Sequence, residues 1–147
     1  MKKCVVMLLL LLSPAVAAED LFMVRSQLSF PEAMTVLQQT IRENDYQVSR
    51  VQRIDIGLTR SGYKTDKYRV VFFGNPEEVR ELADRYPELI AYLPLKIAIF
   101  AENDETILLS SSFTHLRPFY AGTDLLASFD RWETDIQRML ERVRTAE

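Results

Sequence analysis

His115 is the only histidine in this 147-residue chain, so acid–base or metal chemistry by an imidazole has one candidate. The carboxylates Glu102, Asp104 and Glu105 precede it and are the residues with which it would have to build a metal site. Metal sites usually combine several His, Cys or carboxylate ligands. We therefore interpret His115 as a loop residue at the end of a strand, and we predict no metal ion and no cofactor.

Three consecutive serines at 110–112 lie just before His115 and suggest a Ser-His-Asp triad. The chain lacks the G-x-S-x-G turn that exposes a serine nucleophile, and a serine so near the histidine in sequence fits the triad geometry poorly. We interpret the serines as the polar edge of a strand and predict no catalytic residue.

Lys96 follows Pro94 and interrupts an otherwise apolar predicted strand. Such a lysine must extend its amino group to water or meet a carboxylate or a ligand. Glu102 and Glu78 are the carboxylates considered as its partners. Extension to water is the simpler interpretation, and binding of a ligand is the functional one.

The turn Phe73-Gly74-Asn75-Pro76 ends one predicted strand and opens a helix, a place where backbone N–H groups can hold an anion. It has too few glycines for a phosphate-binding loop, and Pro76 removes a donor. A capped strand-to-helix turn accounts for all its residues. If the domain has a pocket, we expect it between sheet and helices near Asn75, Lys96 and Glu102, with apolar walls and one charged anchor.

The formal net charge of −3 argues against a general nucleic-acid-binding protein, which needs a basic surface. Cys4 is the only cysteine. Because it lies in the segment that we expect to be removed, the mature chain is predicted to lack disulfides, thiol catalysis and thiolate metal ligands.

Residues 1–18 have the three parts of a secretory signal peptide. Two lysines precede an unbroken apolar run over residues 4–12, and Ala15 and Ala17 supply small residues for a cleavage site. The apolar stretch from Cys4 to Ala18 has 15 residues and contains a proline. It is too short for a membrane-spanning anchor, which needs about 20 residues. We predict cleavage after Ala17 or Ala18, a periplasmic product in a Gram-negative host, and a single domain over residues 19–147.

Hydrophobic periodicity predicts an α+β domain, with an antiparallel sheet of about five strands and helices packed mainly on one face. The segments predicted as strands are 21–28, 46–56, 68–73, 96–102 and 106–113. Capping signals begin helices at Ser29 and Asn75, and a long C-terminal helix follows from Leu125. Residues 55–61 are ambiguous, since a short helix ended by Gly62 fits them as well.

Two predicted strands, 68–73 and 95–101, are apolar on both faces. A sheet with one face in water should instead alternate apolar and polar residues. We therefore expect a cover on the second face: the C-terminal helix, a second copy of the chain, or a ligand. A symmetric homodimer is the preferred interpretation.

The middle of the chain, about residues 30–113, resembles the bacterial family catalogued as "domain of unknown function 302". The resemblance rests on Phe73-Gly74-Asn75-Pro76 after one strand, Leu93-Pro94-Leu95-Lys96 before another, and Glu102 at the end of that second strand. It implies an α+β fold, often in exported proteins, and no established activity. Asn103-Asp104-Glu105 stands where the family pattern has a glycine-rich hairpin, and the C-terminal helix is longer than expected.

These observations predict a periplasmic small-molecule-binding or protein-interaction module rather than an enzyme. One alternative is an enzyme or redox accessory that acts on a small molecule with a cofactor or a partner. Another is a structural dimer subunit of an envelope complex. The expected partners are an unidentified small molecule, a periplasmic protein or a second copy of the chain, and not nucleic acid.

Overall fold

The computed structural model describes residues 20–64 and 67–147. The predicted signal peptide, residues 1–18, lies outside the described residues. The elements along the chain are β1 (Leu21–Ser26), α1 (Phe30–Glu43), β2 (Gln47–Arg53), α2 (Asp55–Arg60), β3 (Tyr68–Gly74), α3 (Pro76–Arg85), the 3-10 helix η1 (Pro87–Ala91), β4 (Leu95–Glu102), β5 (Glu105–Ser111), the 3-10 helix η2 (Arg117–Tyr120) and α4 (Leu125–Arg144).

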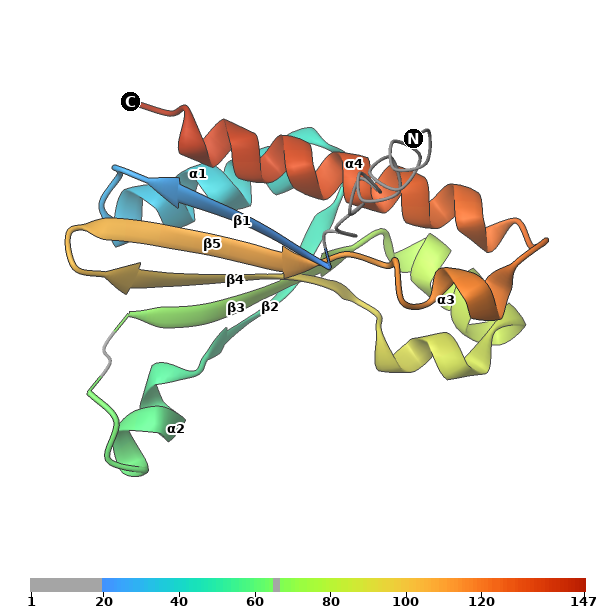
Figure 1. The fold of residues 1–147 in the computed structure, drawn as a ribbon, viewed down its shortest axis with the longest axis horizontal. Coiled ribbons are helices and arrows are strands. Elements are labelled where there is room, and N and C mark those ends of the chain that lie inside the picture. Colours follow the sequence, from blue (N-terminus) through green and yellow to red (C-terminus); the bar gives the residue numbers. More distant parts are fainter. Residues whose placement is uncertain (1–19, 65–66) are drawn as a thin grey trace, which may run out of the picture.

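The strands form one five-stranded sheet in the order β1-β5-β4-β3-β2 (Figure 1). Each neighbouring pair is antiparallel. A tight turn at Asn103 joins β4 to β5, with the left-handed φ of 54° that asparagine tolerates. The predicted antiparallel sheet of about five strands is confirmed.

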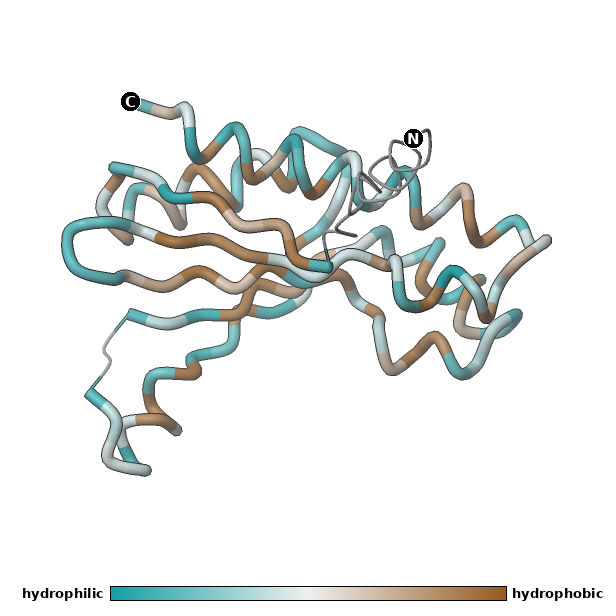
Figure 2. The backbone as a smooth tube through the Cα atoms, in the orientation of Figure 1, coloured by the Kyte–Doolittle hydropathy of each residue, from teal (hydrophilic) through white to brown (hydrophobic). Residues whose placement is uncertain are grey.

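The two long helices, α1 and α4, pack against each other on one face of the sheet (Figure 1). Figure 2 shows hydrophobic stretches along β3, β4 and β5, and hydrophobic and hydrophilic residues in alternation along α4, as expected of a helix with one buried side. The residues that α4 buries are Leu125, Phe129, Trp132, Ile136, Met139, Leu140 and Val143. The predicted long C-terminal helix and the one-sided packing are therefore confirmed.

Aromatic packing attaches the segment after β5 to α4. The ring of Phe113 stacks on that of Phe129, with ring centres 5.0 Å apart, and lies 5.4 Å from Trp132. Tyr120 meets Phe129 edge to face at 5.8 Å. These contacts position residues 112–120 at the end of the sheet, where the candidate site lies.

Local signals begin and end the shorter elements as predicted. The backbone N–H of Ser29 donates to the Glu32 carboxylate at 3.0 Å, which forms part of the capping box of α1. Residues 55–61 contain the short helix α2, and Gly62 follows it with a left-handed φ of 89°. The buried carboxylate of Asp55 accepts from Arg53 at 2.9 Å and also pairs with Arg69.

The opposite face of the sheet, called here the open face, is apolar in its middle. Because side chains alternate along a strand, the cross-strand register assigns the apolar middle: Met23, Tyr68, Val70, Phe72, Ala98, Phe100, Ile107 and Leu109. Leu21 and the charged residues Arg25, Arg50, Lys96, Glu102 and Glu105 lie toward the edges of the same face. Ile107 is only 2% exposed although it is not part of the main core. The C-terminal helix was one of the three covers considered for this face. It lies on the other face, because α4 uses its apolar stripe to enclose the core together with α1.

Candidate functional site

A pocket of about 170 Å³ lies where β4 begins and β5 ends. It is lined by Tyr92, Leu95, Lys96, Ser110, Ser111, Ser112, Phe113, His115 and Ile136. Its walls thus combine apolar side chains from the core with a lysine, a histidine and hydroxyl groups. We call this the Lys96 pocket.

Lys96 is the second residue of β4, and its neighbours Leu95 and Ile97 are buried while its own side chain is exposed. Strand alternation explains this, because the residues on either side point into the core. Among the described residues, the Lys96 amino group has no hydrogen-bonding or ion-pairing partner. It is therefore free to bind an anion.

The hydroxyl groups of the pocket differ in their availability. Ser110 donates to the backbone carbonyl of Lys96 at 2.8 Å, which ties β5 to β4. Ser112 donates to the hydroxyl of Thr114 at 3.1 Å. Ser111 and His115 are exposed, and the His115 ring lies 5.9 Å from that of Tyr92. Ser111, His115 and Lys96 are thus the polar groups best placed to meet a ligand.

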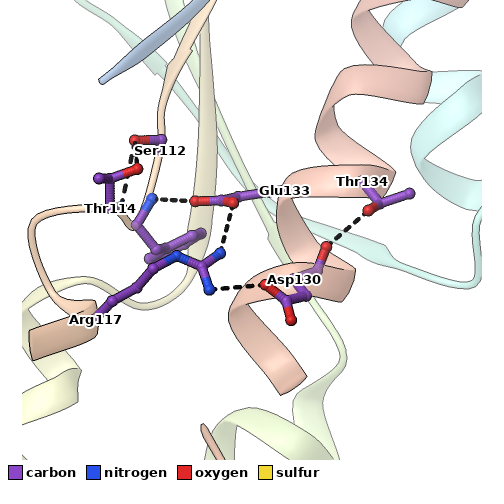
Figure 3. Close-up of polar contacts among 7 residues, drawn as sticks. Ser112, Thr114, Arg117, Asp130, Glu133 and Thr134 are labelled. Carbon is purple, nitrogen blue, oxygen red and sulfur yellow. Dashed lines mark hydrogen bonds and ion pairs between the residues drawn. The ribbon is translucent and has the colours of Figure 1, made fainter. Parts of the chain in front are cut away.

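Glu133 of α4 holds the segment that forms one wall of the pocket (Figure 3). One of its carboxylate oxygens accepts the backbone N–H of Phe113 at 2.6 Å, and the other accepts from Arg117 at 2.7 Å. Arg117 also donates to Asp130 at 2.7 Å. Figure 3 shows these contacts joining the chain after β5 to α4. The Glu133 carboxylate thus holds the segment that contains Phe113, one of the residues that line the pocket, against α4.

Asn75 lies in a different place and has a structural role. Its side-chain oxygen accepts from the backbone N–H groups of Glu77 at 3.0 Å and Glu78 at 3.2 Å, which caps α3. It borders a second cavity of about 400 Å³ whose charged groups are largely paired with one another. The pairs are Glu78 with Arg131, Asp135 with Arg138, and Tyr46 with Asp135. Burial, and then the hydrogen bond to Asp135, raise the pKa of the Tyr46 hydroxyl.

Glu102 lies at the opposite end of β4 from Lys96. The six residue steps between them correspond to about 20 Å along the strand. Its carboxylate accepts from Arg25 at 3.3 Å, and Arg25 also donates to Glu105 at 3.0 Å. The structure therefore does not bring Asn75, Lys96 and Glu102 into one pocket. Lys96 and Glu102 lie at opposite ends of β4, and Asn75 caps α3 beside a different cavity.

Sequence reasoning missed three lining residues: Leu95, Phe113 and Ile136. They look like ordinary core or loop residues in the sequence, and no spacing marks them as a group. Within residues 20–64 and 67–147, no cluster of three or more His, Cys, Asp or Glu side chains is arranged to hold a metal ion. None of the helices in the same ranges is long and apolar enough to cross a membrane.

Comparison with known proteins supports the fold. The chain is similar to the crystal structure of an uncharacterized conserved protein, DUF302, from Bacillus stearothermophilus, with a TM-score of 0.65 and 16% sequence identity. The similarity covers 86% of this chain and 97% of the other. No curated protein matches the chain. The model of the family described as "Domain of unknown function DUF302" matches residues 22–143, and the chain belongs to that family.

Proposed function

We propose that the chain is an exported binding module that holds a small carboxylic acid in the Lys96 pocket. The observation that carries the proposal is an unpaired lysine beside a pocket with apolar walls. A carboxylate gives the amino group the charged partner that the described part of the chain does not supply.

The size of the pocket limits the ligand. One water occupies about 30 Å³ in the liquid, so 170 Å³ corresponds to about six waters and to a ligand of about six non-hydrogen atoms. Binding sites for drug-sized ligands are larger, about 300–1,000 Å³. A short monocarboxylate such as butyrate fits this size and offers both a charged head and an apolar tail.

The residues that line the pocket indicate where the carboxylate and the apolar tail of such a ligand would bind. Lys96 and the hydroxyl of Ser111 are donors for the carboxylate oxygens. Leu95, Phe113 and Ile136 form the apolar part that receives the tail. A ligand this small is expected to bind weakly, with a dissociation constant on the order of 1 mM.

Isothermal titration calorimetry with butyrate tests the site, with butyramide as the uncharged ligand of the same shape. We expect binding of butyrate, much weaker binding of butyramide, and at least about tenfold weaker butyrate binding by Lys96→Ala. Lys67→Ala is the matched control, since Lys67 is an exposed lysine outside the pocket. Equal binding of butyrate and butyramide, or unchanged binding by Lys96→Ala, would refute the proposal.

Export is tested on the same preparation. The full gene product is expressed in a Gram-negative host, and the protein purified from the periplasm is weighed by mass spectrometry. A mass that corresponds to residues 18–147 or 19–147 supports export and cleavage of the signal peptide. Recovery of the uncleaved chain in the membrane fraction contradicts it.

A further inference from the structure

We propose that the open face packs against the open face of a second copy of the chain, about a two-fold axis that runs across the strands. This inference does not depend on the proposed ligand. It starts from the eight apolar residues that define the open face and from the position of α1 and α4 on the opposite face. An apolar patch of this kind on a sheet marks a surface that another layer covers.

The dimensions of the face fit a dimer. Five strands about 4.8 Å apart and about seven residues long cover roughly 24 Å by 23 Å, or about 550 Å² in projection. Side-chain relief makes the accessible area larger than the projection. A stable interface buries about 800 Å² per partner, so nearly the whole face has to take part. A six-atom ligand cannot cover such an area, whereas a second sheet can.

The central row of the face favours close packing of two sheets. Cross-strand pairing places Met23, Leu109, Ala98 and Val70 side by side across four strands. Ala98 lies on the middle strand, and its small side chain permits the spacing of about 10 Å at which sheets stack. Met23 is 53% exposed at the end of this row, which is unfavourable for a thioether side chain without a cover.

Charge decides the direction of the axis. On β4 the open face carries Lys96 near one end and Glu102 at the other. An axis parallel to the strands places Lys96 opposite Lys96 and Glu102 opposite Glu102, which is repulsive. An axis across the strands, along the row of Ala98, places Lys96 of each copy over Phe100 of the other. Glu102 then lies about 7 Å further along that strand, within reach of the long lysine side chain, so the contact is attractive. The amino group has three donors, so it meets that carboxylate and still presents a donor to the pocket.

The same axis brings aromatic side chains together. Tyr68 and Phe100, whose ring centres are 5.2 Å apart, lie on one side of the central row, and Phe72 lies on the other. Rotation about an axis along the central row places Phe72 of one copy over the Tyr68 side of the second copy. Aromatic pairs stabilise an interface by more than the burial of their surface area alone contributes.

Sedimentation equilibrium of the purified periplasmic protein tests the interface. We expect a dimer for the wild type and at least about a 100-fold higher dimer dissociation constant for Met23→Glu, because the axis brings the two introduced carboxylates together. Met23 is more than half exposed, so the variant is expected to fold, which circular dichroism checks. Phe119→Glu, at an 81% exposed site outside the face, is the matched control and should remain dimeric.

A charge exchange tests the axis. Lys96→Glu and Glu102→Lys should each weaken the dimer. Glu102→Lys also removes a partner of Arg25 within the chain, so the double variant is compared with Glu102→Lys, which lacks the same pair. The double variant should dimerise more tightly than Glu102→Lys, because residues 96 and 102 of the two copies again carry opposite charges. A monomeric wild type would overturn the proposal and leave a ligand or another protein as the cover. A dimer that resists Met23→Glu but dissociates with Phe119→Glu would also overturn it. Failure of butyrate binding leaves these results unaffected, so the two proposals fail separately.

Discussion

Removal of the Glu133 carboxylate provides a quantitative test of how the pocket wall is held. In Glu133→Ala, the backbone N–H of Phe113 loses its acceptor at 2.6 Å, and Arg117 loses one of its two carboxylate partners. Phe113 is only 7% exposed, so its N–H has little access to water as a replacement. The perturbation therefore combines an unsatisfied donor with a weakened ion pair.

The expected loss follows from these two contributions. A hydrogen bond to a charged group contributes about 1.5–3 kcal/mol, and the partly exposed Arg117 pair adds less than about 1 kcal/mol. We expect Glu133→Ala to lower the free energy of unfolding by about 2–3 kcal/mol. For a domain of this length, that corresponds to a decrease in Tm of roughly 6–10 °C.

Urea denaturation followed by circular dichroism measures this difference, with thermal unfolding as a second readout. Asp130→Ala is the control, because it removes the other carboxylate partner of Arg117 at a side chain that is 68% exposed. Its expected cost is below about 1 kcal/mol. The reasoning is refuted if Glu133→Ala stays within about 0.5 kcal/mol of the wild type, or if Asp130→Ala costs as much.

Two further predictions concern residues outside the pocket. Asn75→Ala removes the cap of α3 and should lower stability by about 1 kcal/mol in urea denaturation, with butyrate binding unchanged; loss of binding would mean that Asn75 contributes to the site. The hydrogen bond from Arg53 and the charge of Arg69 hold the pKa of Asp55 below its ordinary value, although burial opposes them. A carboxylate with a lowered pKa stabilises the folded state at pH values above its ordinary pKa, and this stabilisation is lost as the pH falls through the folded-state pKa. Asp55→Asn should therefore be less stable than the wild type at neutral pH, and the difference in stability should shrink on acidification. Urea denaturation midpoints of the wild type and Asp55→Asn, measured from neutral pH down through the ordinary pKa of an aspartate, check this prediction. A difference between the two midpoints that does not change with pH contradicts it.

Most secondary-structure elements were predictable because their signals are local. The capping box at Ser29 and the Asn75 cap depend on residues two or three positions apart, and both are present. The periodicity of α4 follows from its burial against a single layer. Strand ends were less certain, since residues 21–28 and 46–56 were predicted as strands while β1 ends at Ser26 and β2 at Arg53.

The candidate site was predictable only in part. Lys96, His115 and the serines at 110–112 each stand out in the sequence by residue type, and they line one pocket. Asn75 and Glu102 were grouped with Lys96 by family resemblance and charge. The structure separates them, because Asn75 is occupied as a helix cap and Glu102 pairs with Arg25 at the far end of β4.

The sequence alone determined the class of fold, the family and the main helices and strands, because hydrophobic periodicity and capping act over short distances. Its apolar strands also predicted a cover on the second face of the sheet, and this stays a prediction. Only the tertiary structure decided that α4 joins α1 on one face, and that Ile136 of α4 and Tyr92 complete the Lys96 pocket. These outcomes depend on contacts between residues far apart in the chain, which are set by the competition of all apolar surfaces for burial in one core.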